Sequence, residues 1–192
     1  MSHFTKLTTK IKDLEALTQA AQRMGFRVTR NAPCRYYSGS KEKDFVINLP
    51  GKFDLAVAKS GNNYDLEADW WGGYVANYVG QGGSRLMQRY AVEKAKIEAY
   101  KKGLTVTETQ KNDSISLIMT DYESGGQITV ECDPNGETQV RTSGFQGEAC
   151  MKFRDLEEAL GVTESISFTG EYYASENESA TNAYAYADYS GY

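Results

Sequence analysis

Short segments in which apolar and polar residues alternate constrain the fold of this 192-residue chain more than any other feature. Alternation of period two places every second side chain on one face of a strand, which is typical of a sheet with one buried face. The pattern runs through residues 45–70 in closely spaced segments separated by Pro50-Gly51 and Ser60-Gly61-Asn62-Asn63. Strands that follow each other so tightly predict an antiparallel meander.

Two other segments have helical periodicity. Asp13 is suited to cap a helix, and the apolar residues after it recur at helical spacing until Gly25. A longer helix is predicted from Ser84, as its cap, to about Lys102, with Gly103 ending it. Leu86, Tyr90 and Ile97 form its apolar stripe, and a glycine-rich loop precedes it.

A second unit follows the pair Gly125-Gly126, which is the strongest boundary signal in the chain. Ile128, Val130 and Cys132 alternate after it, and Asp133-Pro134-Asn135-Gly136 is a strong hairpin turn. A helix at about 148–160 and a last strand complete a predicted β-β-α-β module. At roughly 50 residues this module is marginal alone, so we expect it to pack on the first module or on a partner.

The predicted fold class is therefore α+β, with an antiparallel sheet meander and two helices followed by the small module. Residues 1–123 form the first module, residues 126–173 form the second, and residues 174–192 are a Tyr-rich segment that we expect to be disordered.

Composition narrows the classes of function. A net charge of −5 disfavours a general nucleic-acid binder, which needs Lys and Arg to displace counterions from phosphates. No apolar run approaches the roughly 20 residues needed to span a bilayer, and the first residues lack a signal pattern. The three cysteines are scattered, which favours a reducing compartment. We expect a soluble, non-exported protein.

Asp65, Glu67 and Asp69 are the first candidate site. Period two places their carboxylates on one face, where they could bind a hard cation or carry acid–base chemistry. The solvent face of a half-buried sheet has the same pattern, and we favour that interpretation, so no metal is predicted.

Trp70 and Trp71 are adjacent at the end of the same strand and point to opposite faces. Trp70 continues the apolar row and is predicted to lie in the core. Trp71 is a candidate contact for a ligand or partner, although it could also cover the edge of the sheet.

Arg85, Arg89 and Lys96 form a basic stripe on the long helix. This stripe could contact the acidic strand or, less favoured, a nucleic acid.

Cys150 lies in the first turn of the predicted helix 148–160, where the helix dipole favours a reactive thiolate. It also shares a helical face with Phe153, Leu156 and Leu160, so we favour a core position. His3 is the only histidine, and the cysteines are not spaced as zinc ligands.

Residues 1 to about 121 resemble the hypothetical chloroplast open reading frame 35 family of cyanobacteria and plastids, which has no established activity. The resemblance rests on the segments Met1-Ser2-His3-Phe4-Thr5, Ile11-Lys12-Asp13-Leu14-Glu15, Ala68-Asp69-Trp70-Trp71-Gly72 and Gln88-Arg89-Tyr90-Ala91.

Residues 126 to about 173 resemble a second small family of unknown function. The shared segments are Asp133-Pro134-Asn135-Gly136, Gly144-Phe145-Gln146-Gly147-Glu148-Ala149-Cys150, Leu156-Glu157-Glu158-Ala159-Leu160-Gly161 and Thr169-Gly170-Glu171-Tyr172-Tyr173. The resemblance implies that the two units are usually separate proteins, encoded near an AAA-type ATPase and a ferredoxin. It also implies a cyanobacterium, plastid or cyanophage as the source.

We therefore predict a non-enzymatic accessory or adaptor protein that acts by protein–protein contact, beside an AAA-type ATPase or a ferredoxin-linked system. It would act in the bacterial or phage-infected cytoplasm or in the plastid stroma. The alternative is an enzyme, cofactor-binding or metal-binding protein that uses the acidic strand, Trp71 and Cys150. No specific cofactor is indicated by the residues.

Overall fold

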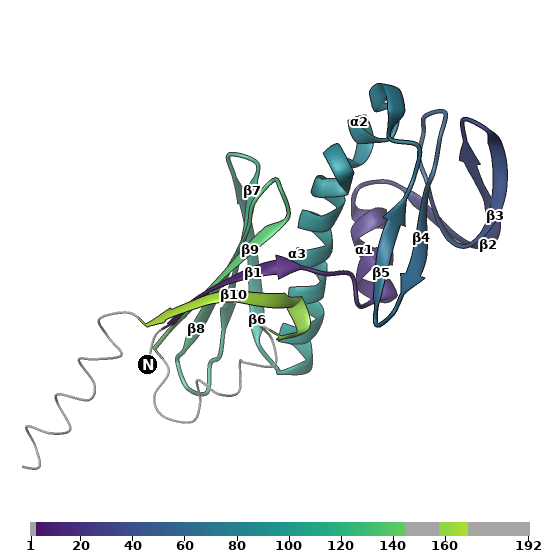
Figure 1. Cartoon of the computed structure of the whole chain (residues 1–192). Coiled ribbons are helices and arrows are strands. Elements are labelled where there is room, and N and C mark those ends of the chain that lie inside the picture. The colour runs from purple at the N-terminus through teal and green to yellow at the C-terminus, as the bar shows by residue number, and fades with distance from the viewer. Residues whose placement is uncertain (1–2, 145–157, 169–192) are drawn as a thin grey trace, which may run out of the picture.

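The computed structural model describes residues 3–144 and 158–168, and it has the predicted α+β architecture. The elements are β1 His3–Thr9, α1 Leu14–Arg23, β2 Arg27–Tyr36, β3 Gly39–Asn48, β4 Leu55–Ser60, β5 Asn63–Glu67, α2 Ala76–Val79, α3 Ser84–Lys101, β6 Thr105–Lys111, β7 Ser114–Thr120, β8 Gln127–Cys132, β9 Glu137–Ser143 and β10 Gly161–Phe168. Figure 1 shows helix α3 between two sheets, with α1 on the side of the smaller one.

The strands form two antiparallel sheets of different origin. The four-stranded sheet, β2-β3-β4-β5, is the predicted meander. The six-stranded sheet has the order β10-β1-β9-β8-β7-β6, so strand β1 lies between two strands from the other end of the chain. Sequence patterns gave no indication of this pairing, because alternation shows which face of a strand is buried but does not identify its neighbours.

Helix α1 begins and ends where the sequence predicts. The Oδ1 atom of Asp13 accepts hydrogen bonds from the N–H groups of Glu15 and Ala16, at 2.8 and 3.2 Å. Gly25, just after the helix, has φ = 81°, which a glycine adopts without steric strain.

The predicted cap of helix α3 is wrong by one residue. Gly83 takes the cap position at φ = 86°, and Ser84 is already the first helical residue. A Cβ atom at Gly83 would lie 2.5 Å from Cδ1 of Leu66 on β5. The helix therefore starts against the small sheet, and this contact requires glycine more than it requires a capping side chain.

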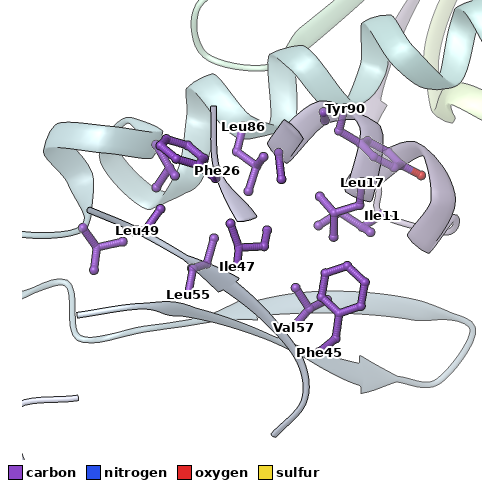
Figure 2. Close-up of a cluster of buried hydrophobic side chains, with 14 of the residues drawn as sticks. Ile11, Leu17, Phe26, Phe45, Ile47, Leu49, Leu55, Val57, Leu86 and Tyr90 are labelled. Atoms are coloured by element: carbon purple, nitrogen blue, oxygen red, sulfur yellow. The ribbon is translucent and has the colours of Figure 1, made fainter. Parts of the chain in front are cut away.

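One side of α3 packs on α1 and the small sheet. Leu86 and Tyr90 are fully buried there with Leu17 of α1 and Ile47 of β3, and Ile97 packs against the same cluster (Figure 2). The predicted stripe of α3 is thus confirmed, and it joins the helix to the meander.

The other side of α3 packs on the large sheet through small residues. Ala91, Val92, Ala95 and Ala99 are fully buried against strands β7 and β8. The predicted alternation on β8 is confirmed, because Ile128, Val130 and Cys132 all lie in this second core. Small side chains on the helix let the sheet approach closely.

The alternation predicted for β3 holds only in part. Phe45, Val46 and Ile47 are consecutive and all buried. Phe45 and Ile47 face α1, whereas Val46 packs with Cys34 and Ala56 in a separate cluster. This arises because the end of β2 lies close to the start of β4, where the N–H of Asp54 donates to the carbonyl of Arg35 at 3.0 Å.

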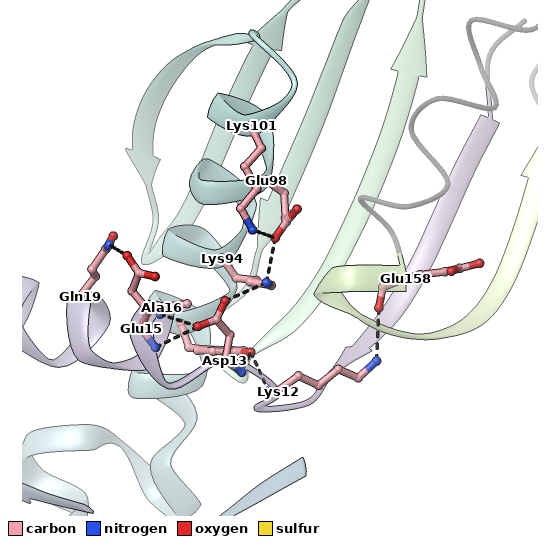
Figure 3. A network of polar contacts seen from close by, with 10 residues as sticks. Lys12, Asp13, Glu15, Ala16, Gln19, Lys94, Glu98, Lys101 and Glu158 are labelled. Carbon is pink, nitrogen blue, oxygen red and sulfur yellow. Dashed lines mark hydrogen bonds and ion pairs between the residues drawn. The ribbon is translucent and has the colours of Figure 1, made fainter. Parts of the chain in front are cut away.

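A polar network ties the start of α1 to α3 (Figure 3). The Tyr90 hydroxyl accepts hydrogen bonds from the backbone N–H groups of Lys12 and Asp13, at 2.8 and 3.2 Å. Nζ of Lys94 contacts Asp13 at 2.9 Å and Glu98 at 2.8 Å. Burial acts to raise the pKa of Asp13, but the bonds from Lys94 and the backbone outweigh it, so the pKa of Asp13 is lowered.

The predicted boundary at Gly125-Gly126 lies in a turn inside the large sheet. Gly125 N–H donates to the carbonyl of Asp121 at 2.8 Å, and β7 and β8 pair on either side of this turn. Of the predicted second module, the structure describes β8, β9, helical residues 158–160 and β10. Residues 145–157 and 174–192, which include much of the predicted helix and the Tyr-rich segment, lie outside the described residues. Within the described residues, no helix is both long and apolar enough to cross a membrane.

We predict that Tyr90→Phe lowers the free energy of unfolding by about 1–3 kcal/mol, because two backbone N–H groups lose their acceptor in a partly buried position. Tyr100→Phe is the matched control on the same helix, where the side chain is 61% exposed. That control should change stability by less than about 0.5 kcal/mol in urea unfolding. Equal effects of the two variants would contradict the role given to the Tyr90 hydroxyl.

Candidate partner-binding site

The three carboxylates of the acidic strand are not combined into one site. Asp65 and Glu67 are exposed on β5, whereas Asp69 lies beyond the end of that strand. Glu67 pairs with Lys43 at 2.7 Å, and Asp69 accepts a hydrogen bond from the backbone N–H of Tyr37. Among the described residues, no group of three or more His, Cys, Asp or Glu side chains is placed to hold a metal ion.

Two residues of the basic stripe form ion pairs with acidic side chains. Arg89 and Lys96 both contact Glu108 of β6 and the buried carboxylate of Glu93. Arg85 donates to the backbone carbonyl of Asn77. The acidic partners of Arg89 and Lys96 are thus Glu93 and Glu108, and the acidic strand does not contribute to these pairs.

The two tryptophans lie beyond the end of β5 and not on the strand itself, where the sequence pattern places them. Trp70 packs against the core of the small sheet, and Trp71 is 73% exposed. Leaving so much of an indole in water sacrifices the free energy that its burial would contribute. Trp71 is therefore the first element of a candidate site.

Two further aromatic rings lie beside Trp71. The centroid of the Tyr37 ring is 6.1 Å from that of Trp71, and Tyr37 is 79% exposed; the centroid of the Tyr74 ring is 6.3 Å from that of Trp71. Tyr74 rests edge-on against the buried ring of Phe53 at 5.4 Å. We call Tyr37, Trp71 and Tyr74 the aromatic surface. Nζ of Lys52 lies 4.8 Å above the Tyr74 ring and adds a positive charge.

Family comparisons cover the sequence on both sides of the turn at Gly125-Gly126. Residues 17–119, more than half of the chain, match a family described as protein of unknown function (DUF1257). The chain belongs to the DUF1257 family. Residues 128–173 match a second family, protein of unknown function (DUF2997). No curated protein matches the chain. The aromatic surface lies wholly within the DUF1257 region.

The buried carboxylate of Asp54 anchors the segment that leads to Tyr37. Asp54, 1% exposed, accepts two bonds from the Arg35 guanidinium, at 2.7 and 2.8 Å, and two from the backbone N–H groups of Arg35 and Leu49. These bonds anchor the end of β2, and Asp69 then holds the next turn through Tyr37 N–H. The Tyr37 ring is thereby brought against Trp71.

Glycine allows the close approach of Trp71 and Tyr74. Gly72 has φ = 68°, and a Cβ atom there would lie 2.8 Å from Cε2 of Tyr74. Any other residue would strain the backbone and displace the Tyr74 ring. The glycine-rich loop predicted from the sequence is thus an ordered set of short turns in the DUF1257 region.

The cysteines that the structure describes are unsuited to nucleophilic chemistry. Cys34 and Cys132 are both fully buried and free. Burial raises the pKa of the Cys34 thiol, and it raises the pKa of Cys132 to about 12. Cys150, the predicted candidate thiol, lies outside the described residues.

A hollow of about 180 Å³ lies at the end of the large sheet, mainly in the DUF2997 region. Glu131, Asp133 and Glu137 contribute to its lining. Asp133 is already engaged, because its carboxylate accepts bonds from the N–H groups of Asn135 and Glu137 in the β8–β9 turn. This hollow is therefore better explained as the outside of a hairpin turn than as a catalytic site.

We predict that Asp54→Asn lowers the free energy of unfolding at neutral pH by about 2–4 kcal/mol, because it leaves the Arg35 guanidinium without its charge partner. Burial acts to raise the pKa of Asp54, but its bonds from Arg35 and the backbone outweigh this, so the pKa is lowered. The stabilisation is therefore complete above about pH 4, the unfolded value, and is lost as the pH falls through the lower folded value.

Urea unfolding between pH 2 and pH 7 measures this difference, with exposed Asp65→Asn as the control variant. The difference in the free energy of unfolding between wild type and Asp54→Asn should be constant near neutral pH and should decrease at acidic pH. A difference that stays the same down to pH 2 would show that charge is not the cause.

Proposed function

We propose that this protein is an accessory or adaptor protein that binds a protein partner through the aromatic surface. The observation that carries the proposal is the exposure of Trp71, at 73%, in ring contact with Tyr37, at 79%. Trp and Tyr are the residues most enriched at binding hot spots, because they bury a large area while few side-chain torsions are immobilised.

The contacts that hold the Tyr37 segment and Tyr74 in place support the same proposal. Asp54 and Asp69 hold the Tyr37 segment, and Phe53 supports Tyr74 from below. A surface that is already ordered loses little conformational entropy when a partner binds. Lys52 favours a partner that brings a carboxylate to the rim of the contact.

The resemblance noted above points to the class of partner. Its genomic neighbours suggest an AAA-type ATPase or a ferredoxin-linked system, in the cytoplasm of a cyanobacterium or phage-infected cell or in a plastid stroma. The alternative, an enzyme or metal-binding protein that uses the acidic strand, has weaker support, because Glu67 and Asp69 are engaged within the fold.

Trp71→Ala should leave folding unchanged and weaken partner binding by at least about tenfold, as expected when a hot-spot residue contributing more than about 1.4 kcal/mol is removed. Tyr122→Ala is the matched control, because Tyr122 is 81% exposed but lies after β7, away from the aromatic surface in the sequence. Wild type and the two variants are each immobilised and incubated with a cyanobacterial lysate, and the bound proteins are compared by quantitative mass spectrometry.

The proposal expects at least one protein that wild type and Tyr122→Ala retain and that Trp71→Ala loses. The dissociation constant of the purified partner is then measured with all three proteins. If every bound protein is retained equally by the three variants, the aromatic surface is not the binding site.

A further inference from the structure

The large sheet interleaves strands from the two ends of the chain. Strands β1, β6 and β7 belong to residues 1–121, which contain the DUF1257 match, and β8, β9 and β10 belong to residues 127–168, which overlap the DUF2997 match. The order β10-β1-β9-β8-β7-β6 therefore changes between the two parts three times. We call residues 1–121 the first part and residues 127–168 the second part.

Neither part completes this sheet alone. Strand β1 pairs only with β9 and β10, so both of its neighbours come from the second part. Strand β10 in turn is joined to β9 only through β1. Without the second part, β1 and one edge of β7 would expose unpaired backbone N–H and C=O groups.

The core behind the sheet is shared in the same way. The first part contributes Ala91, Val92, Ala95, Ala99, Leu104, Ile115, Leu117 and Met119, and the second part contributes Ile128, Val130, Cys132, Val140 and Leu160. Separating the parts would expose both sets to water. Loss of that burial is the main cost of separation, because the transfer of apolar surface from the core into water is unfavourable.

Two hydrogen bonds and one close steric contact define how the two parts pack together. Nε2 of Gln88 on α3 donates to the carbonyl of Cys132 at 3.0 Å. Gly136 approaches the first turn of α3 so closely that a Cβ atom there would lie 3.0 Å from Cβ of Met87. Nζ of Lys12 donates to the carbonyl of Glu158 at 3.2 Å (Figure 3).

The covalent connection between the parts is slight by comparison. Residues 122–125 are exposed and form a turn held by Asp121, whose carboxylate accepts from Glu123 N–H and Ser124 Oγ. We propose that the second part is a strand-donating partner of the first, and that this chain is a two-protein complex joined by one turn. The partner that fits the first part is thus a chain of DUF2997 type, which supplies two strands to flank β1 and one to pair with β7. This inference does not depend on the aromatic surface.

The test begins with the full chain carrying a protease recognition site inserted between Ser124 and Gly125. The folded protein is cleaved and then analysed by size-exclusion chromatography and native mass spectrometry at micromolar concentration. We expect a 1:1 complex of the two pieces whose melting temperature rises with protein concentration, whereas that of the uncut chain does not. Pieces that separate on cleavage without denaturant would overturn the proposal.

A matched pair of variants locates the contact. Gly136→Ala places a methyl group against Met87, and it should raise the dissociation constant of the cleaved pieces about tenfold. Gly61→Ala introduces the same kind of strain, since Gly61 has φ = 59°, but its added Cβ meets no atom within 4 Å. It should leave association unchanged, and equal weakening by both variants would contradict the proposed interface.

Discussion

Helix α3 carries apolar side chains on two opposite faces, and water must be excluded from both of them at once. Leu86 and Tyr90 are buried against α1 and the small sheet, and Ala91 and Ala95 are buried against the large sheet. A helix of this kind cannot be satisfied by a single sheet. Each sheet therefore covers one apolar face of α3. Loss of either sheet would expose the face that it covers to water.

The proposed partner-binding surface and the proposed assembly surface lie on different parts of the molecule. Beside the small sheet, Asp54 anchors the end of β2, and the Tyr37 ring that follows lies against Trp71 on the aromatic surface. The large sheet joins residues 1–121 to residues 127–168, because β1 pairs on both sides with strands from the second part. Partner binding on one sheet and assembly on the other would thus proceed without competing for the same residues.

The sequence predicted several features whose cause is local. Asp13 and Gly25 mark the ends of α1, and the pattern of Ile128, Val130 and Cys132 gives both a strand and its buried face. The core position of Trp70 was predicted, whereas the exposure of Trp71 was one of two alternatives that the sequence left open. Tyr37 was missed, because its contact with Trp71 depends on Asp69, which lies 32 residues away. The insertion of β1 between β9 and β10 was missed for the same reason, since no local pattern encodes a pairing between distant strands.

Native-state hydrogen exchange of the uncut protein tests most directly whether the two family regions form one structural unit. Backbone amides of β1, β8 and α3 should share one opening free energy, equal to that of global unfolding, because breaking any of these elements exposes the common core. If β8 and β9 exchange through a separate opening of lower free energy while α3 stays protected, the regions fold as independent units and the account is contradicted.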